Sequence, residues 1–256
     1  MNPTAIEWAH LYGPDTGFTW NPVVGCTAGC SIATTGYDCY ARRQAKRQRA
    51  HCHLCYDFVP HLHPERLTQP NQRQTPAGIF VGSMCDLFDL AVQLEWRERI
   101  WHTCSLSPQH TFLVLTKKPQ NITTGDLKCL PGNVHLGVTI NRPEEEWRWR
   151  DLLAARRHGL RLWAGNCFVS IEPLLGLFDR SSSSMLGRGP FPHPSWVIAG
   201  GDTTPGALAP DKRHTDSLAR LCFDTNVPYF AKHNLGATAD AELVGRQEWP
   251  AWGHRP

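Results

Sequence analysis

The sequence predicts an α/β fold, a partial barrel of the (β/α)6 type with a TIM-like layout and mostly parallel strands. Short apolar runs rich in β-branched and aromatic residues recur along the chain, which is typical of strands buried on both faces of a parallel sheet. Helical stretches separate these runs, and this repeated alternation is expected of a barrel or of an open doubly wound sheet. Polar residues follow nearly every run, as they do where barrel strands reach an active site.

Seven runs are the expected strands, and each of them is short. They cover residues 18–24, 79–82, 111–116, 134–140, 167–171, 196–199 and 227–231. The expected helices cover residues 40–50, 87–105, 144–162 and 216–226. In the second helix, the apolar face is expected to contain Leu90, Leu94, Trp101 and Cys104. The third helix begins with acidic residues and ends with basic ones, which suits the helix dipole.

The composition is that of a folded chain. With 256 residues, of which 41% are hydrophobic and 19% charged, the chain carries too much apolar surface to be disordered. No run of 18 apolar residues occurs, so we expect no membrane-spanning helix. We expect a single domain over residues 1–256, with a long loop at about 56–78 and a flexible excursion at about 180–195.

The ten cysteines are about 4% of the chain, which is below the share typical of a disulfide scaffold. The first residues, MNPTAIEWAHLYG, show no basic segment followed by an apolar one, so we expect no secretory signal and a cytoplasmic protein. Reduced thiols are metal ligands, catalytic groups or small buried side chains. Cys104, Cys167 and Cys222 fall on apolar faces and are expected in the core. A net charge of +3 and a pI of about 8.4 do not by themselves indicate nucleic-acid binding.

Three cysteines near the first strand are the strongest chemical signal. Cys26, Cys30 and Cys39 lie within fourteen residues, directly after that strand and before the first helix. Three thiolates can bind an iron–sulfur cluster and leave one iron without a protein ligand, and an open metal position is what catalysis requires. Ordinary loop cysteines, or a structural zinc site completed by a fourth ligand, are the alternatives.

Several motifs resemble the radical S-adenosylmethionine (SAM) superfamily and, within it, a phage-associated group of uncharacterised three-Cys-motif proteins. The matching segments run in order from about residue 20 to 234 and include WNPVVGC, CYARR, FVGSMCDLF, TFLVLTKKP, FVSIEPLLG, WVIAGGDTTPGA and VPYFAKHN. Two departures stand out. Eight residues separate Cys30 from Cys39, where the superfamily commonly has two, and we interpret them as an insertion in the cluster loop. Gly-Gly-Asp at 200–202 stands where the group more often has Gly-Gly-Glu.

The resemblance implies a mechanism that depends on cofactors. Cys26, Cys30 and Cys39 would hold a 4Fe-4S cluster, and SAM would chelate the open iron. An electron from an external ferredoxin- or flavodoxin-type donor would split SAM and generate a 5′-deoxyadenosyl radical, which abstracts hydrogen from the substrate. The substrate is unknown; the phage-type resemblance favours a nucleotide or nucleic acid by analogy. No catalytic side chain is assigned.

The resemblance also implies a SAM site at successive strand ends. Ser83 and Asp86 would bind the amino group of SAM. Candidates for its ribose and carboxylate are Thr116, Thr139, Asn141 and Glu172. For each of these residues, a structural hydrogen bond is the alternative.

A second group of metal-ligand residue types follows the first helix. Cys52 and Cys55 form a C-x2-C motif, and His61 and His63 come soon after it. Two cysteines and two histidines satisfy tetrahedral zinc, although the spacing C-x2-C-x5-H-x-H is not that of a usual zinc finger. A zinc site or second cluster, a loop staple, and unpaired surface residues are the alternatives.

The candidate substrate residues are mostly cationic. They are His61, His63, Arg66, Lys117, Asp202, Lys232 and His233. We expect the cations to form a mouth for an anionic substrate, unless they pair with acidic residues of neighbouring loops. A basic run on the 40–50 helix indicates either a phosphate contact or a solvated face. Two other functions compete with the radical enzyme: a non-catalytic zinc- or cluster-binding interaction module, and a non-radical barrel hydrolase that uses Glu172, Asp202, Lys232 or His233.

Overall fold

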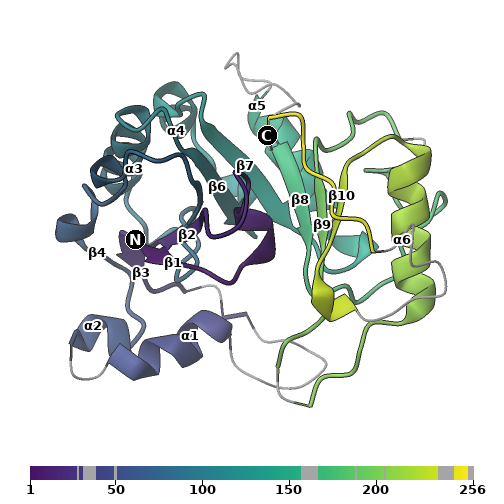
Figure 1. Ribbon diagram of the computed structural model, residues 1–256, viewed down its shortest axis with the longest axis horizontal. Coiled ribbons are helices and arrows are strands. Elements are labelled where there is room, and N and C mark those ends of the chain that lie inside the picture. The colour runs from purple at the N-terminus through teal and green to yellow at the C-terminus, as the bar shows by residue number, and fades with distance from the viewer. Residues whose placement is uncertain are drawn as a thin grey trace. The chain divides into compact units, whose positions relative to one another are not determined.

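The computed structural model describes residues 1–27, 29–30, 39–48, 51–156, 167–187, 189–204, 206–235 and 245–252. The fold is mixed α/β with mostly parallel strands, which confirms the expected class (Figure 1). The chain divides into two compact units, Met1–His135 and Leu136–Arg255, and each is described by itself below. None of the helices among the described residues is both long and apolar enough to cross a bilayer.

The first unit contains a four-stranded ladder in the order β1-β2-β5-β6. Its strands are β1 (Asn2–Pro3), β2 (Gly17–Trp20), β5 (Gly78–Val81) and β6 (Thr111–Thr116). The last three pair in parallel, and β1 joins β2 antiparallel. Their side chains are largely buried, with Trp20, Ile79 and Phe112 fully enclosed. This is the burial that continuous apolar runs predict.

Two helices of this unit pack against each other, α3 (Leu94–Ser105) and α4 (Thr124–Cys129). On α3, Ile100, Trp101 and Cys104 are buried. Leu90, expected on the same face, precedes the helix and is 84% exposed, because α3 begins only at Leu94. The expected helix start at residue 87 is therefore wrong.

A smaller group of elements carries the cysteine motifs. It consists of β3 (Val23–Val24), α1 (Tyr40–Ala45), η2 (Lys46–Gln48), α2 (His53–Tyr56) and β4 (His61–Leu62), followed by the 3-10 turns η3 (Pro64–Arg66) and η4 (Pro70–Gln72). The long loop expected at 56–78 thus contains a strand that pairs antiparallel with β3. Part of the basic run packs on aromatic rings, because Arg42 lies 5.3 Å from the Phe58 ring centroid and Lys46 lies 4.3 Å from that of Tyr56.

The second unit is built on parallel strands in the order β7-β8-β9-β10. The strands are β7 (Val134–Thr139, which begins at the unit boundary), β8 (Cys167–Ile171), β9 (Val197–Ala199) and β10 (Tyr229–Ala231). The helices are η6 (Pro143–Glu145), α5 (Trp147–Arg156), α6 (Lys212–Asp224) and η8 (His233–Leu235). No pairing among the described strands of either unit closes its ladder into a barrel. As expected, Cys104, Cys167 and Cys222 are buried.

The segment expected to be a flexible excursion is anchored in the second unit. Met185 and Leu186 are fully buried. The buried Glu146 carboxylate accepts hydrogen bonds from the Ser183 hydroxyl at 2.6 Å and from the Ser184 amide at 2.7 Å. These contacts explain how a polar, serine-rich stretch becomes part of a packed structure.

Candidate metal centre

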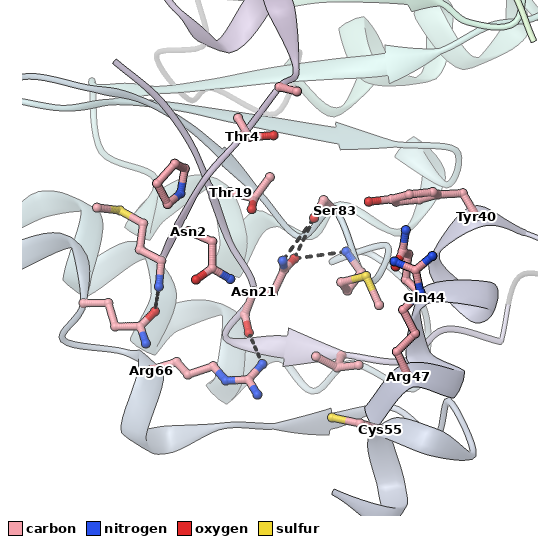
Figure 2. Close-up of a pocket in the computed structure, with 16 residues that line it drawn as sticks. Asn2, Thr4, Thr19, Asn21, Tyr40, Gln44, Arg47, Cys55, Arg66 and Ser83 are labelled. Carbon is pink, nitrogen blue, oxygen red and sulfur yellow. Dashed lines mark hydrogen bonds between the residues drawn. The ribbon is translucent and has the colours of Figure 1, made fainter. Parts of the chain in front are cut away.

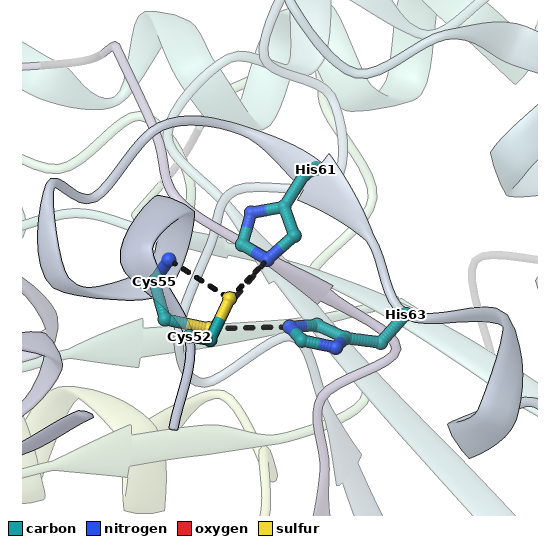
Figure 3. A group of neighbouring side chains, drawn as sticks. All are labelled: Cys52, Cys55, His61 and His63. Carbon is teal, nitrogen blue, oxygen red and sulfur yellow. Dashed lines mark hydrogen bonds between the residues drawn. The ribbon is translucent and has the colours of Figure 1, made fainter. Parts of the chain in front are cut away.

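Two local structures bring the second Cys and His group together. Cys52 is the N-cap of α2 and its sulfur accepts a hydrogen bond from the Cys55 amide at 3.3 Å, so one turn of chain presents both thiols on one side. His61 and His63 are two residues apart along an extended segment, which places their side chains on the same face. The four ligand atoms all lie within 4.8 Å of one another, and Figure 3 shows the side chains converging.

The distances within this group fit a tetrahedral metal. His61 Nε2 lies 3.4 Å from Cys52 Sγ and 3.5 Å from Cys55 Sγ, and His63 Nε2 lies 3.2 Å from Cys55 Sγ. Zinc binds sulfur at about 2.3 Å and imidazole nitrogen at about 2.0–2.1 Å, so in a tetrahedron the two ligand atoms stand about 3.5 Å apart. The group therefore has nearly the spacing that a bound zinc ion requires.

Each imidazole ring is oriented by a hydrogen bond at its Nδ1 atom. The Nδ1 atom of His61 lies 2.7 Å from the Val59 carbonyl oxygen, and that of His63 lies 2.8 Å from Glu65 Oε1. A ring that donates from Nδ1 keeps its lone pair on Nε2, which is the atom that faces the thiols. These partners therefore select the tautomer that a metal needs.

Burial sets the protonation of the group in the metal-free protein. Burial and the neighbouring Cys52 thiol raise the pKa of Cys55 to about 11. Burial and the Arg66 guanidinium lower the pKa of His63 below its ordinary value, so this imidazole is neutral at pH 7. Neutral imidazole is the form that binds metals, and a metal displaces the proton from a coordinating thiol.

The metal-ligand segment also contacts the chain that leads to Cys26. The His63 amide donates to the Pro22 carbonyl at 2.7 Å, and His61 pairs with Val24 in the β3–β4 register. Gly25 has a φ of +97°, and a Cβ atom there would lie 2.4 Å from the Val59 carbonyl. Only glycine allows this close approach.

Cys26 and Cys39 lie in one small apolar cluster. Both pack against the buried side chains of Ala41, Ala45 and Phe58. Cys30 is partly buried, and the insertion between Cys30 and Cys39 falls in residues 31–38, outside the described residues. Within the described part of the chain, the Cys52, Cys55, His61 and His63 group is the only one in which three or more ligand atoms gather this closely.

Asp89, which the sequence analysis did not single out, holds the loop that carries Cys26. Its buried carboxylate accepts hydrogen bonds from the Cys26 thiol at 3.3 Å, the Thr27 amide at 3.0 Å and Lys118 Nζ at 2.9 Å. Burial acts to raise its pKa, but hydrogen bonds from the Ala91 amide, Lys118 and Thr27 hold the pKa well below its usual range. Asp89 is therefore an anion beneath the Cys26 loop.

The proposed SAM residues of the first unit are held in internal hydrogen bonds. Asp86 accepts from the Thr116 hydroxyl at 2.7 Å and from the Lys117 amide at 2.8 Å, and burial raises its pKa above the ordinary value. The Asn21 amide donates to the Ser83 hydroxyl at 3.0 Å. These hydrogen bonds hold the side chains in place near the ends of β5 and β6.

In the second unit, Glu172 and Lys232 form an ion pair at the ends of β8 and β10. The Asn141 side chain donates to the Pro173 carbonyl at 2.9 Å, so it fixes the chain after β8. Thr139 is buried at the end of β7, and His233 begins η8.

Asp202 follows the Gly-Gly pair after β9. Its Oδ1 accepts from the Thr204 amide at 2.8 Å, and its buried Oδ2 has no partner among the residues that the structure describes. Gly201 is held by the Asn234 side chain, which donates to its carbonyl oxygen at 2.9 Å and accepts from its amide at 3.0 Å. A Cβ atom at Gly201 would lie 2.6 Å from the Asn234 carbonyl oxygen, so this close approach requires glycine.

A pocket of about 510 Å³ lies in the first unit (Figure 2). Tyr40, Gln44 and Arg47 line it from α1 and η2, and Arg66 lines it from η3. The sixteen lining residues include these two arginines and no Asp or Glu. Of the candidate residues from the sequence, Cys55, Arg66 and Ser83 reach this pocket.

Arg66 is positioned by backbone on both sides. Its guanidinium donates to the Asn21 carbonyl at 3.1 Å, and its own carbonyl accepts from the Trp20 indole at 2.8 Å. Arg47 was visible in the sequence only as part of a basic run, and Asn21 carried no signal of its own. Both became site residues because distant segments meet at the pocket.

Comparison with known proteins gave one finding. Neither the curated proteins nor the solved structures compared with this chain gave a match. Residues 3–249 match the family model described as "Protein of unknown function (DUF5131)". Because this match covers nearly the whole sequence, the chain belongs to the DUF5131 family.

Proposed function

We propose that this protein is a radical SAM enzyme that holds a 4Fe-4S cluster on Cys26, Cys30 and Cys39. The observation that carries the proposal is that Cys26, which follows β3, and Cys39, which precedes α1, both pack against the apolar cluster of Ala41, Ala45 and Phe58. Thiolates are the ligands that such clusters use, and three of them leave one iron free for SAM. The resemblance of the ordered motifs to the superfamily supports the same assignment.

The donor set fits the cluster, and the surrounding residues fit a supporting role. When bound, the cluster and SAM supply one-electron cleavage of SAM and abstraction of hydrogen from the substrate. Asp89, paired with Lys118, holds the Cys26 loop through the Thr27 amide. The Cys26 thiol donates to Asp89 only in the cluster-free protein, because a coordinating thiol is deprotonated. The low pKa of Asp89 keeps this support charged at neutral pH.

The proposal includes SAM-binding side chains near strand ends, and each unit is considered by itself. In the first unit the candidates are Ser83, Asp86 and Thr116, near the ends of β5 and β6. The candidates of the second unit are Thr139, Asn141 and Glu172, near the ends of β7 and β8. Because both oxygens of Asp86 already accept hydrogen bonds, its part is to position the ends of β5 and β6. The electron would come from a ferredoxin- or flavodoxin-type protein in a reducing cytoplasm, where ten thiols persist.

We propose an anionic substrate, such as a nucleotide or a nucleic acid. The support is the pocket of the first unit, whose lining has two guanidinium groups and no carboxylate. Arg66 can grip a phosphate with two parallel hydrogen bonds. Both cations have an acidic neighbour, because Arg66 Nε lies 3.6 Å from Glu65 Oε1 and Lys232, a second candidate from the sequence, pairs with Glu172.

The test is anaerobic reconstitution of the full chain with iron and sulfide, followed by SAM and dithionite. We expect a brown protein that converts SAM to 5′-deoxyadenosine and methionine. Replacement of Cys26, Cys30 or Cys39 with Ala should abolish both the colour and the product, whereas Cys129→Ala, at an exposed thiol, should change neither. Full iron and sulfide retention in Cys39→Ala, or no SAM cleavage by the loaded wild type, would overturn the proposal.

A second candidate function is a metal-stabilised interaction module without catalysis. The converging Cys52, Cys55, His61 and His63 ligands favour it, because four protein ligands leave no open position for chemistry. Colourless, zinc-containing protein that takes up no iron on reconstitution would support this candidate over the enzyme.

A further inference from the structure

We propose that Cys52, Cys55, His61 and His63 hold one structural Zn²⁺ ion. The ion would join α2 to β4 and thereby brace the chain that leads to Cys26. This site is separate from the proposed cluster, and its existence does not depend on the proposed enzyme activity.

The ligand set selects the metal. Two thiolates and two imidazole nitrogens are soft or borderline donors that suit zinc and suit magnesium or calcium poorly. The measured separations of 3.2–3.5 Å between sulfur and nitrogen atoms are close to the edge of a zinc-centred tetrahedron. All four positions are filled by protein, which is the arrangement of a structural site.

The residues around the ligands are arranged as those around a metal. The Val59 carbonyl and the Glu65 carboxylate hold the two rings through Nδ1, and the Cys55 amide donates to the Cys52 sulfur. Such outer partners orient the ligands and raise their basicity. Hydrogen bonds between these side chains alone would be weak, because sulfur is a poor partner.

The ion would close a short loop between two elements that are themselves short. Helix α2 spans only His53–Tyr56, and β4 spans only His61–Leu62. Elements this short are marginal without tertiary support. The β3–β4 pairing and the bond from the His63 amide to Pro22 then carry the constraint to Gly25 and Cys26.

The test begins with metal analysis of the full chain purified without added iron. We expect one zinc per chain in the wild type and loss of that zinc in Cys52→Ser and His61→Ala. The matched control is His53→Ala, since His53 is exposed on the same helix and outside the group. The conservative variant His61→Cys should keep the zinc, because it replaces one ligand with another.

Two further measurements decide the outcome if a variant fails to fold. Chelation of wild-type zinc followed by cobalt(II) should give the intense visible bands of a tetrahedral cobalt–thiolate site. The triple variant Cys26→Ala, Cys30→Ala, Cys39→Ala should bind zinc and cobalt as the wild type does, even though it cannot build the proposed cluster. Zinc that survives His61→Ala, or that disappears in the triple variant, would overturn the inference.

Discussion

The Thr116 hydroxyl donates to the Asp86 carboxylate at 2.7 Å, which ties the end of β6 to the loop after β5. The other carboxylate oxygen accepts from the Lys117 amide at 2.8 Å. Two strand ends that carry candidate site residues are thus held together by one partly buried acid. This role explains why an aspartate stands here even before any ligand is considered.

We expect Thr116→Val to lower the free energy of unfolding by about 1–3 kcal/mol, because Asp86 would lose a partner for a partly buried oxygen. Urea unfolding followed by fluorescence measures this change. Thr124→Val is the control, since Thr124 is exposed at the start of α4. Equal stability of the two variants would show that the bond between Thr116 and Asp86 contributes little.

A buried ion pair connects α3 and α4. Arg97 Nε lies 2.5 Å from Asp126 Oδ1, and both side chains are nearly inaccessible. We expect Arg97→Met to destabilise the protein by about 3–5 kcal/mol, because Asp126 would remain buried without its partner. Arg213→Met is the comparison, since the pair of Arg213 with Asp211 is exposed, and it should leave the denaturant midpoint nearly unchanged.

The ten thiols should differ sharply in reactivity. Burial raises the pKa of Cys85, Cys104 and Cys222 far above the ordinary value, so these residues remain protonated at pH 8. Because the thiolate is the nucleophile, we expect iodoacetamide to label exposed Cys129 first and these three last. Mass spectrometry of the digested protein measures the order in which the cysteines are labelled.

The same labelling reports on the proposed zinc. Cys52 and Cys55 should be protected from iodoacetamide in the protein as purified. After chelation of the metal, Cys52 should become reactive, because it is the less buried of the two thiols. The labelling of Cys129 serves as the internal control because no metal should affect it. Rapid labelling of Cys52 before chelation would contradict metal protection.

Six of the seven expected strands correspond to one strand each of the parallel ladders, because each is a buried apolar run. The first run is divided into β2 and β3 at Asn21-Pro22. A proline inside an apolar run indicates such an interruption, because proline cannot donate a hydrogen bond to the sheet. Helix α4 was missed although Thr123 and Asp126 form a capping box, since its six residues show little apolar periodicity. The expected helix at 144–162 corresponds to η6 and α5, which ends at Arg156 among the described residues, and residues 157–162 of the expectation lie outside them.

The site was predictable only where its residues are close in sequence. The spacing of Cys52, Cys55, His61 and His63 indicated a metal as one alternative, and the fold of α2 and β4 makes them converge. Asp89 and Lys118 lie 29 residues apart and meet only because β5 and β6 are neighbours. No local pattern reveals such a pair, since its cause is strand order.

The pocket of the first unit should bind anions through its arginines. We expect Arg47→Gln and Arg66→Gln together to weaken the binding of labelled single-stranded RNA or a nucleotide at low salt. Lys232→Gln is the control in the second unit, because that ammonium group is already paired with Glu172.

Salt dependence separates an electrostatic site from other binding, because each phosphate that the protein neutralises releases counterions. For single strands the slope of log K against log salt is about −0.7 per contact, so losing both arginines should flatten it by about 1.4. The single variant Arg47→Gln, at an exposed position in η2, should account for half of this change without disturbing the bond from Arg66 to the Asn21 carbonyl. Binding that is equally strong in the double variant and in Lys232→Gln would place the anion site outside this pocket and would remove the support for an anionic substrate there.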